Sequence, residues 1–357
     1  MEPIIDGQNP EHRARLRLDP WRTGFADEFA SARPVANIEL ELDVERAPGS
    51  WGPMVPVETL AEPRHLIFVD GVRRVEARCT FDTPNGESAA GIFASFAFGT
   101  AEIVERQAQI VQQHVRRRLL LIGQTVGDEY LPKKPSFEVQ SVAPPDEDLS
   151  DSGQLLSNTL QNQMRQAEAD LIETLPAGKD CLIIADGPLR SGSTQPQQAV
   201  GYIKRLQQPY LEGAEREVLR RLPAGLRTPI FVLDSHEFRR WTWFVRLADP
   251  RRGESDFAGL ARLEIPADSH LDLADVQRLA DLTTRLLPRF APKPYEDGRA
   301  PQNLRPIGAL EKKLRHMLGD PKLIRRYIAV HLARLDQQPT NGTARNESPR
   351  NREVTLR

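Results

Sequence analysis

Cysteine and long apolar runs are the two things this sequence has least of. Its 357 residues include only two cysteines, Cys79 and Cys181, and seven scattered histidines. That excludes a disulfide framework and makes a structural zinc site improbable, so any metal must be held mainly by carboxylates. No segment approaches the about 18 consecutive apolar residues of a membrane span, and residues 1–6 lack the regions of a signal peptide. We therefore expect a cytoplasmic protein with buried free thiols and no membrane contact.

A nucleotide-driven motor is also excluded, because the sequence contains no Gly-x-x-x-x-Gly-Lys-Ser/Thr loop. The net charge of -2 gives no global sign of nucleic-acid binding, although the 48 Lys and Arg residues can still cluster locally. With 39% hydrophobic and 27% charged residues, the chain can bury a sizeable core. Composition therefore indicates an ordinary globular protein of one large domain or two.

Hydrophobic patterning predicts a mixed α/β architecture. A half-exposed strand over 38–44 precedes three antiparallel strands over 65–70, 74–81 and 89–98. Then come a helix over 153–175, strands over 181–186, 229–234, 241–247 and 259–265, and helices over 271–288 and 304–334. We divide the chain into an N-terminal accessory segment (1–61), a main domain (62–336) and a tail (337–357) whose polar composition predicts disorder.

Two Asp-Gly pairs follow apolar strand-like runs, at Asp70-Gly71 and at Asp186-Gly187. Each pair alone is more typical of a simple turn after a strand. If the two strand ends meet, however, the carboxylates repel each other unless a cation lies between them. Oxygen ligands suit Mg²⁺ or Mn²⁺. The pattern thus favours a metal site, with the two carboxylates within about 8 Å of each other.

A third carboxylate comes from the helix predicted over 153–175. Its apolar stripe runs through Leu156, Leu160, Met164, Ala167, Leu171 and Leu175. At about 100° per residue, Glu168 lies roughly 60° from the centre of the stripe, Asp170 roughly 100° away and Glu173 almost opposite. Only Glu168 is placed to reach inward. A carboxylate turned to solvent or paired with Arg165 is an equally good interpretation of Glu168 taken alone.

These parts in this order resemble the NurA family of prokaryotic DNA-end-processing nucleases. The resemblance covers about residues 62–330. It rests on four segments: Val69-Asp70-Gly71 with Arg73 and Arg74, Arg165-x-x-Glu168, Asp186-Gly187-Pro188-Leu189, and Gly201-x-x-Lys204-Arg205. The family often has an Ala-His pair in a C-terminal helix. Here the corresponding segment is Gly308-Ala-Leu-Glu311, so we take Glu311 as the fourth metal ligand, with His316 second and a plain surface helix as a competitor.

The resemblance implies an RNase H-like fold and a metal-dependent deoxyribonuclease that uses Mn²⁺ or Mg²⁺. Asp70, Glu168 and Asp186 would be catalytic and would bind two metal ions. The implied activities are 5′ to 3′ exonuclease and single-strand endonuclease action on DNA. The family works in DNA end processing, as in DNA repair or phage defence, as a homodimer docked on the hexameric ATPase HerA.

Four basic residues are expected to bind DNA: Lys204, Arg205, Arg73 and Arg74. Adjacent residues point in different directions, so one of the first pair faces the site, and we favour Lys204. Tyr202, Trp241 and Trp243 could stack on unpaired bases, although core packing suits at least two of them better. Two other functions stay open: a catalytically inactive DNA-binding subunit, and another metal-dependent phosphotransfer enzyme such as a small phosphatase.

Overall fold

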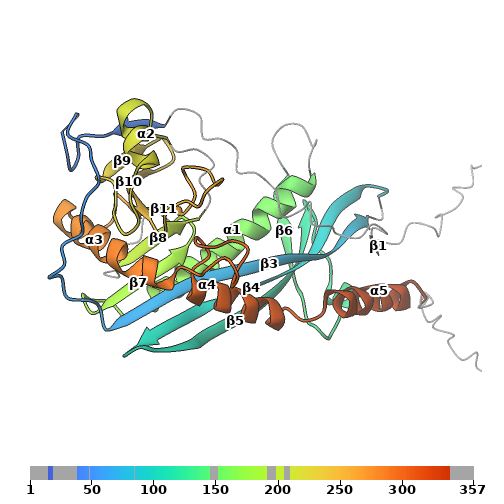
Figure 1. Ribbon diagram of the computed structural model, residues 1–357. Coiled ribbons are helices and arrows are strands. Elements are labelled where there is room, and N and C mark those ends of the chain that lie inside the picture. The colour runs from blue at the N-terminus through green and yellow to red at the C-terminus, as the bar shows by residue number, and fades with distance from the viewer. Residues whose placement is uncertain are drawn as a thin grey trace, which may run out of the picture.

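A single mixed sheet organises the molecule (Figure 1). The computed structural model describes residues 15–18, 38–47, 49–83, 85–144, 152–190, 198–204 and 210–337. Within these residues eleven strands form the sheet, and helices pack on both of its faces. The predicted α/β class, a mixed sheet flanked by helices, is confirmed. No helix among the described residues is long and apolar enough to cross a membrane.

The strand order is β2-β9-β10-β11-β8-β7-β3-β4-β5-β6, and β1 pairs separately with β3. The strands are β1 (Arg15–Leu18), β2 (Glu39–Glu41), β3 (His65–Asp82), β4 (Ser88–Val104), β5 (Gln107–Ile122), β6 (Glu138–Val142), β7 (Cys181–Asp186), β8 (Ala199–Ile203), β9 (Phe231–Asp234), β10 (Arg239–Arg246) and β11 (Leu260–Pro266). The helices are α1 (Ser152–Glu173), α2 (Gly213–Arg220), α3 (Leu273–Phe290), α4 (Arg305–Met317) and α5 (Pro321–Gln337), with a short 3₁₀ turn at Asp128–Tyr130.

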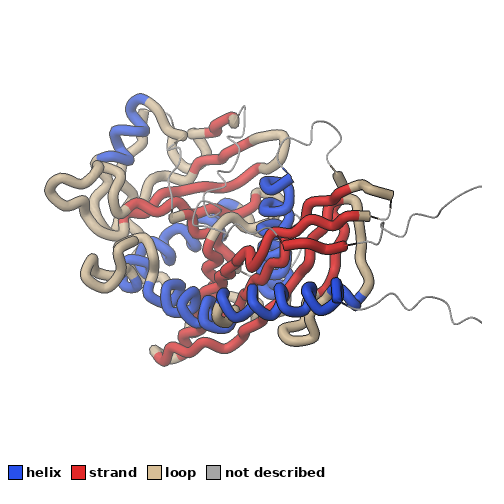
Figure 2. The backbone as a smooth tube through the Cα atoms, turned by 90° about the vertical axis from the view of Figure 1, so that its right-hand side faces the viewer, coloured by secondary structure: helices blue, strands red, loops and turns tan. Residues whose placement is uncertain are grey.

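The centre of the sheet joins an antiparallel meander to a parallel pair. β3, β4 and β5 are antiparallel neighbours, and β7 lies parallel to β3 on the other side, followed by parallel β8. Cys79 and Cys181 are both buried and free, as expected. Figure 2 shows the strands in red, with helices in blue packed beside the sheet.

The first Asp-Gly pair does not end a strand, which corrects the sequence prediction. The runs 65–70 and 74–81 form one continuous strand, β3, in which Gly71 pairs with Phe98 of β4. The third strand of the meander is therefore β5, a segment rich in Gln and Arg that the hydrophobic pattern did not single out. Asp70 lies in mid-strand, whereas Asp186 does end β7, where Gly187 adopts a φ of +111°.

Opposite faces of the sheet carry different helices. Because side chains alternate along a strand, Ile67 and Val69 point to one face and Leu66 and Phe68 to the other. The first pair packs in a core with α1, and the second packs with α3 and α4. The predicted stripe of α1 is buried, while Asp170 and Glu173 are exposed. Helix α1 and helix α4 thus approach β3 from opposite sides.

The helix expected over 304–334 is two helices. Helix α4 ends at Met317, Gly319 has a φ of +82°, and Pro321 begins α5. In Figure 1, α3, α4 and α5 follow one another along the length of the sheet.

The N-terminal region contributes to the same sheet. Its strand is shorter than the predicted 38–44: β2 pairs with β9 at the edge. Close by, the buried Arg227 guanidinium bonds to Glu45 at 2.8 Å and to Asp281 of α3 at 2.7 Å. Residues 1–14, 19–37 and 338–357, which include most of the accessory segment and the tail, lie outside the described residues.

Candidate active site

Four carboxylates from four different elements line one cavity. They are Asp70 of β3, Glu168 of α1, Asp186 of β7 and Glu311 of α4. Lys204, directly after β8, lines it too. The cavity lies where α1 and α4 approach β3 from its two faces, beyond the end of β7. Residues separated by more than 200 positions in the chain therefore share one acidic environment.

The parallel pairing of β3 and β7 explains why Asp70 and Asp186 meet. Val69 pairs with Ala185, so the next residue on each strand is one of the two aspartates. Each aspartate is close enough to shift the pKa of the other. Burial, and then the charge of Asp186, raise the pKa of Asp70 well above its ordinary 3.8. Burial also raises the pKa of Asp186, although Lys204 opposes this.

Glu168 reaches the cavity across the space that Gly71 leaves open. A Cβ at residue 71 would overlap Glu168 Oε1 and come within 3.0 Å of Met164 Cγ. The glycine is thus required for the close approach of α1 to β3, rather than for a turn. Burial and the charge of Asp186 raise the pKa of Glu168 to about 8. The carboxylate therefore meets a like charge at the cavity.

Lys204 supplies the cation nearest the two aspartates. Its Nζ lies 2.5 Å from Asp186 Oδ2 and donates to Asn303 Oδ1 at 3.0 Å. The glycine of the Gly201-x-x-Lys204 segment has a packing role, since a Cβ there would lie 2.8 Å from the Gly187 carbonyl oxygen. Segment 187–189 therefore rests directly on β8, which fixes Lys204 relative to Asp186.

Glu311 is held by two arginines. Arg299 Nη2 donates to Oε2 at 2.8 Å, and Arg315 Nη2 donates to Oε1 at 2.9 Å. Burial raises the pKa of Glu311, but Arg299 and then Arg315 hold it below its ordinary 4.5. His316, the second choice for this position, is exposed and does not line the cavity.

The predicted DNA-binding residues lie in different settings. Arg73 lines the cavity and bonds to Gln161 of α1. Arg74 points to the other face, where it pairs with Glu76 at 2.9 Å and donates to the Gly319 carbonyl at 2.9 Å. Its guanidinium therefore joins β3 to the α4–α5 connection. Arg205 lies outside the described residues.

Two of the aromatic residues considered for base stacking are core residues. Tyr202 and Trp243 are each 0% exposed, and Tyr202 Oη donates to the Gln302 carbonyl at 2.6 Å. Trp241 is partly buried. Stacking on unpaired bases by Tyr202 or Trp243 is therefore wrong for this conformation.

Sequence reasoning missed the cations Arg299 and Arg315. Arg299 belongs to the irregular connection between α3 and α4, whose pattern carries no signal of a site. Arg315 lies one helical turn after Glu311, and this i, i+4 spacing could have indicated the pair. Arg165, one turn before Glu168, also lines the cavity. The acidic cluster is therefore surrounded by arginines that could contact an anion.

The donor chemistry of the cavity suits a divalent cation. Neighbouring carboxylates raise one another's pKa, and a bound cation would stabilise their ionised forms. Mg²⁺ and Mn²⁺ bind oxygen ligands of this kind. Among the described residues, however, no three His, Cys, Asp or Glu side chains already stand as a ligand group. Lys204 is close against Asp186, and both Glu311 oxygens face arginines. Asp70, Glu168 and Asp186 therefore fit an ion better than Glu311 does.

A comparison with solved structures finds similar chains, one of which is a nuclease. The chain is similar to the NurA nuclease from Sulfolobus solfataricus, with a TM-score of 0.44 and 10% identity over 81% of this chain and 89% of that chain. This is a nuclease of the family whose segments the sequence resembles. No protein-family profile matches the chain, and no curated protein matches it. At such a TM-score, function must be inferred from the side chains of the site.

Proposed function

We propose that the protein is a metal-dependent deoxyribonuclease that hydrolyses phosphodiester bonds in DNA. The observation that carries this proposal is the meeting of Asp70, Glu168 and Asp186 in one cavity with raised pKa values. Perturbed pKa values cluster at functional sites, because a fold gains nothing from uncompensated buried charge. Such a cluster is useful when a cation and a phosphate bind beside it.

Asp70, Glu168 and Asp186 would hold two divalent cations, as Mn²⁺ or Mg²⁺. Bound ions of this kind lower the pKa of an attacking water and stabilise the leaving oxygen. The remaining tasks fall to the protein's own cations. Lys204 is positioned to take a phosphate oxygen once an ion takes over its partner Asp186. Glu311 anchors Arg299 and Arg315 at the cavity.

The fold supports an RNase H-like assignment. An aspartate on the first strand of a meander, a helix with a glutamate, and a parallel strand ending in a second aspartate occur here in that order. We extend the proposal to the NurA family's role: end processing of DNA by a homodimer that acts with a HerA-type ATPase, with 5′ to 3′ exonuclease and single-strand endonuclease activity. Four segments of the sequence support this extension.

A second candidate is a catalytically inactive DNA-binding subunit of the same kind of complex. The contact of 2.5 Å between Lys204 Nζ and Asp186 favours it, because an ammonium already neutralises one of the three carboxylates. The two candidates differ in one respect that can be measured: an inactive subunit binds DNA but hydrolyses none with any metal.

The test is to incubate the purified protein with end-labelled single- and double-stranded DNA in Mn²⁺, Mg²⁺ or EDTA. We expect cleavage that needs metal and that falls about 10³-fold in Asp70→Asn and Asp186→Asn, since each loses a carboxylate at the reacting phosphate. Asp170→Asn, an exposed carboxylate on α1, is the matched control and should cleave like the wild type. Equal cleavage by all four proteins would refute the proposal.

A further inference from the structure

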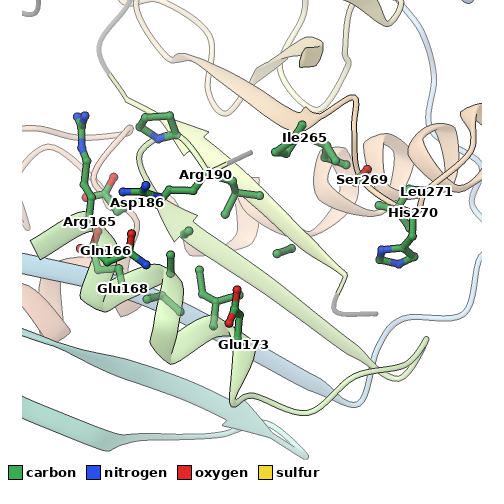
Figure 3. Close-up of a pocket in the computed structure, with 18 residues that line it drawn as sticks. Arg165, Gln166, Glu168, Glu173, Asp186, Arg190, Ile265, Ser269, His270 and Leu271 are labelled. Atoms are coloured by element: carbon green, nitrogen blue, oxygen red, sulfur yellow. The ribbon is translucent and has the colours of Figure 1, made fainter. Parts of the chain in front are cut away.

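A second cavity, of about 290 Å³, opens beside the acidic one (Figure 3). The two cavities share one wall, because Arg165, Glu168, Asp186 and Pro188 line both. In Figure 3 the labelled Asp186 and Glu168 lie at one end, and Ser269 and His270 at the other. A molecule that fills this side cavity therefore extends directly from the carboxylates.

The lining combines apolar side chains with polar ones. The apolar part of the lining comes from α1, the segment after β7, β8, β11 and the β11–α3 connection. Its side chains are Ala169, Ile172, Leu189, Ala199, Ile265 and Leu271. Small-molecule sites are concave and mostly apolar, with a few polar groups that fix orientation. Ser269 supplies such a group: its buried Oγ has no hydrogen-bond partner among the described residues. A ligand that reaches Ser269 would give this hydroxyl a partner.

Positive charge stands at the shared end. Arg165 and Arg190 line the side cavity, and Arg165 is close enough to Glu168 to oppose the rise in the pKa of that carboxyl. Figure 3 shows Arg165 and Arg190 on the Asp186 side, away from Ser269. A ligand with a phosphate at one end and an apolar ring at the other matches this division. A nucleotide of an unpaired strand has that form, whereas the base of an intact duplex is stacked and paired.

We propose that the side cavity receives the unpaired base next to the phosphodiester at the carboxylates. This proposal rests on the proposed nuclease function and deepens it: the substrate that fits has an unpaired nucleotide at the cleaved position. Arg165 and Arg190 contact the flanking phosphates, Ile172 and Leu189 contact the ring, and Ser269 bonds to its edge.

The test combines a filled cavity with a missing base. Single-stranded oligonucleotides, each with one abasic site at a different position, are cleaved in Mn²⁺ by the wild type, Ala169→Phe and Asn162→Phe. Ala169 lines the side cavity, while Asn162 is exposed on the same helix and lines neither cavity. We expect an abasic site at the cleaved position to lower kcat/KM on the order of tenfold for the wild type and Asn162→Phe. For Ala169→Phe the normal and abasic strands should be cleaved alike.

Binding in EDTA separates this proposal from the nuclease itself. A short single strand containing 2-aminopurine should bind the wild type and Asn162→Phe with a fluorescence change that Ala169→Phe loses. If the wild type binds the strand but hydrolyses none, the proposed function fails and the binding comparison still decides the cavity. The proposal is wrong if Ala169→Phe cleaves the abasic strand as poorly, relative to the normal strand, as the wild type does. It is also wrong if the wild type cleaves both strands alike. Ala169→Leu replaces Ala169→Phe if thermal melts show that the larger side chain prevents folding.

Discussion

Two groups of buried carboxylates in this molecule have different surroundings. Around Arg227, the guanidinium bonds to Glu45 and Asp281, and Glu45 also accepts a bond from the Ile230 amide at 2.7 Å. Around Asp70, four acidic side chains share a cavity with Lys204 and four arginines, and Lys204 is the cation that contacts Asp186. In the first group the cation lowers the pKa of Glu45, whereas in the second neighbouring carboxylates raise the pKa values of Asp70 and Glu168. Carboxylates held together against their mutual repulsion distinguish a candidate site from a structural ion-pair network.

The pKa values express the same difference. Burial raises the pKa of Glu45, but the bonds and charge of Arg227 hold it below its ordinary 4.5. Burial and a neighbouring carboxylate raise the pKa of Glu168 to about 8, with only Arg165 opposing. The folded state therefore favours the ionised form of Glu45 and disfavours that of Glu168. A ligand cation would reverse the second preference and leave the first unchanged.

The largest effect should follow from unbalancing the Arg227 group. We expect Arg227→Met to lower the free energy of unfolding by about 3–5 kcal/mol, because it leaves two buried carboxylates without their cation. Asp70→Asn, which removes a like charge from the acidic cluster, should not destabilise the protein. Urea denaturation of both variants measures the contrast. A stability loss in Asp70→Asn as large as that in Arg227→Met would show that both groups are structural.

Mn²⁺ should stabilise the folded protein by binding to Asp70, Glu168 and Asp186. At about 100 times its dissociation constant, free Mn²⁺ should raise the free energy of unfolding by about 2.7 kcal/mol, since it binds the folded state. Asp186→Asn should lose most of this gain, whereas Glu45→Gln should start from a lower stability and keep the gain. Thermal melts with and without Mn²⁺ measure this stabilisation. If Mn²⁺ stabilises Asp186→Asn as much as the wild type, the ion binds elsewhere.

A smaller effect is expected where α1 crosses β3. Gly71→Ala should cost about 1–3 kcal/mol of stability or displace Glu168, because the added methyl overlaps Glu168 Oε1 and presses on Met164. Gly52→Ala is the control, since no atom lies within 4 Å of a Cβ there. Chemical denaturation and metal-dependent cleavage are measured together. Unchanged stability and cleavage in Gly71→Ala would refute the packing that places Glu168.

The smallest expected effect is on the stability of the protein at acidic pH. A group whose pKa is lowered on folding stabilises the fold above its unfolded pKa, and this contribution is lost as pH falls through the folded pKa. For Glu45 the loss begins near pH 4.5 and continues below it. Stability measured from pH 6 downward should therefore fall more steeply in the wild type than in Glu45→Gln. Parallel curves would remove Glu45 from the Arg227 group.

The sequence predicted those parts of the site that depend on local pattern. The stripe of α1 was correctly placed by its helical period, and with it the inward position of Glu168. The strand over 181–186 and its terminal Asp186 also follow from one apolar run that ends before a glycine. Such features are set by neighbours in the chain.

Features set by distant contacts could not be predicted. Asp70-Gly71 has the form of a turn, yet tertiary pairing with β4 and the approach of α1 keep β3 extended through it. The strand β5 was missed because its outer part is rich in Gln and Arg and is supported by β4 rather than by its own pattern. Arg299 comes to the cavity from an irregular connection, and its partner Glu311 was interpreted as a ligand.

The most direct measurement is diffraction at the manganese absorption edge from crystals soaked in Mn²⁺. Our account predicts anomalous density at the carboxylates of Asp70 and Asp186, and none beside Glu45 and Asp281. Crystals of Asp186→Asn should show that density lost or much weakened. Density confined to other sites, while Asp186 remains paired with Lys204, would contradict the account.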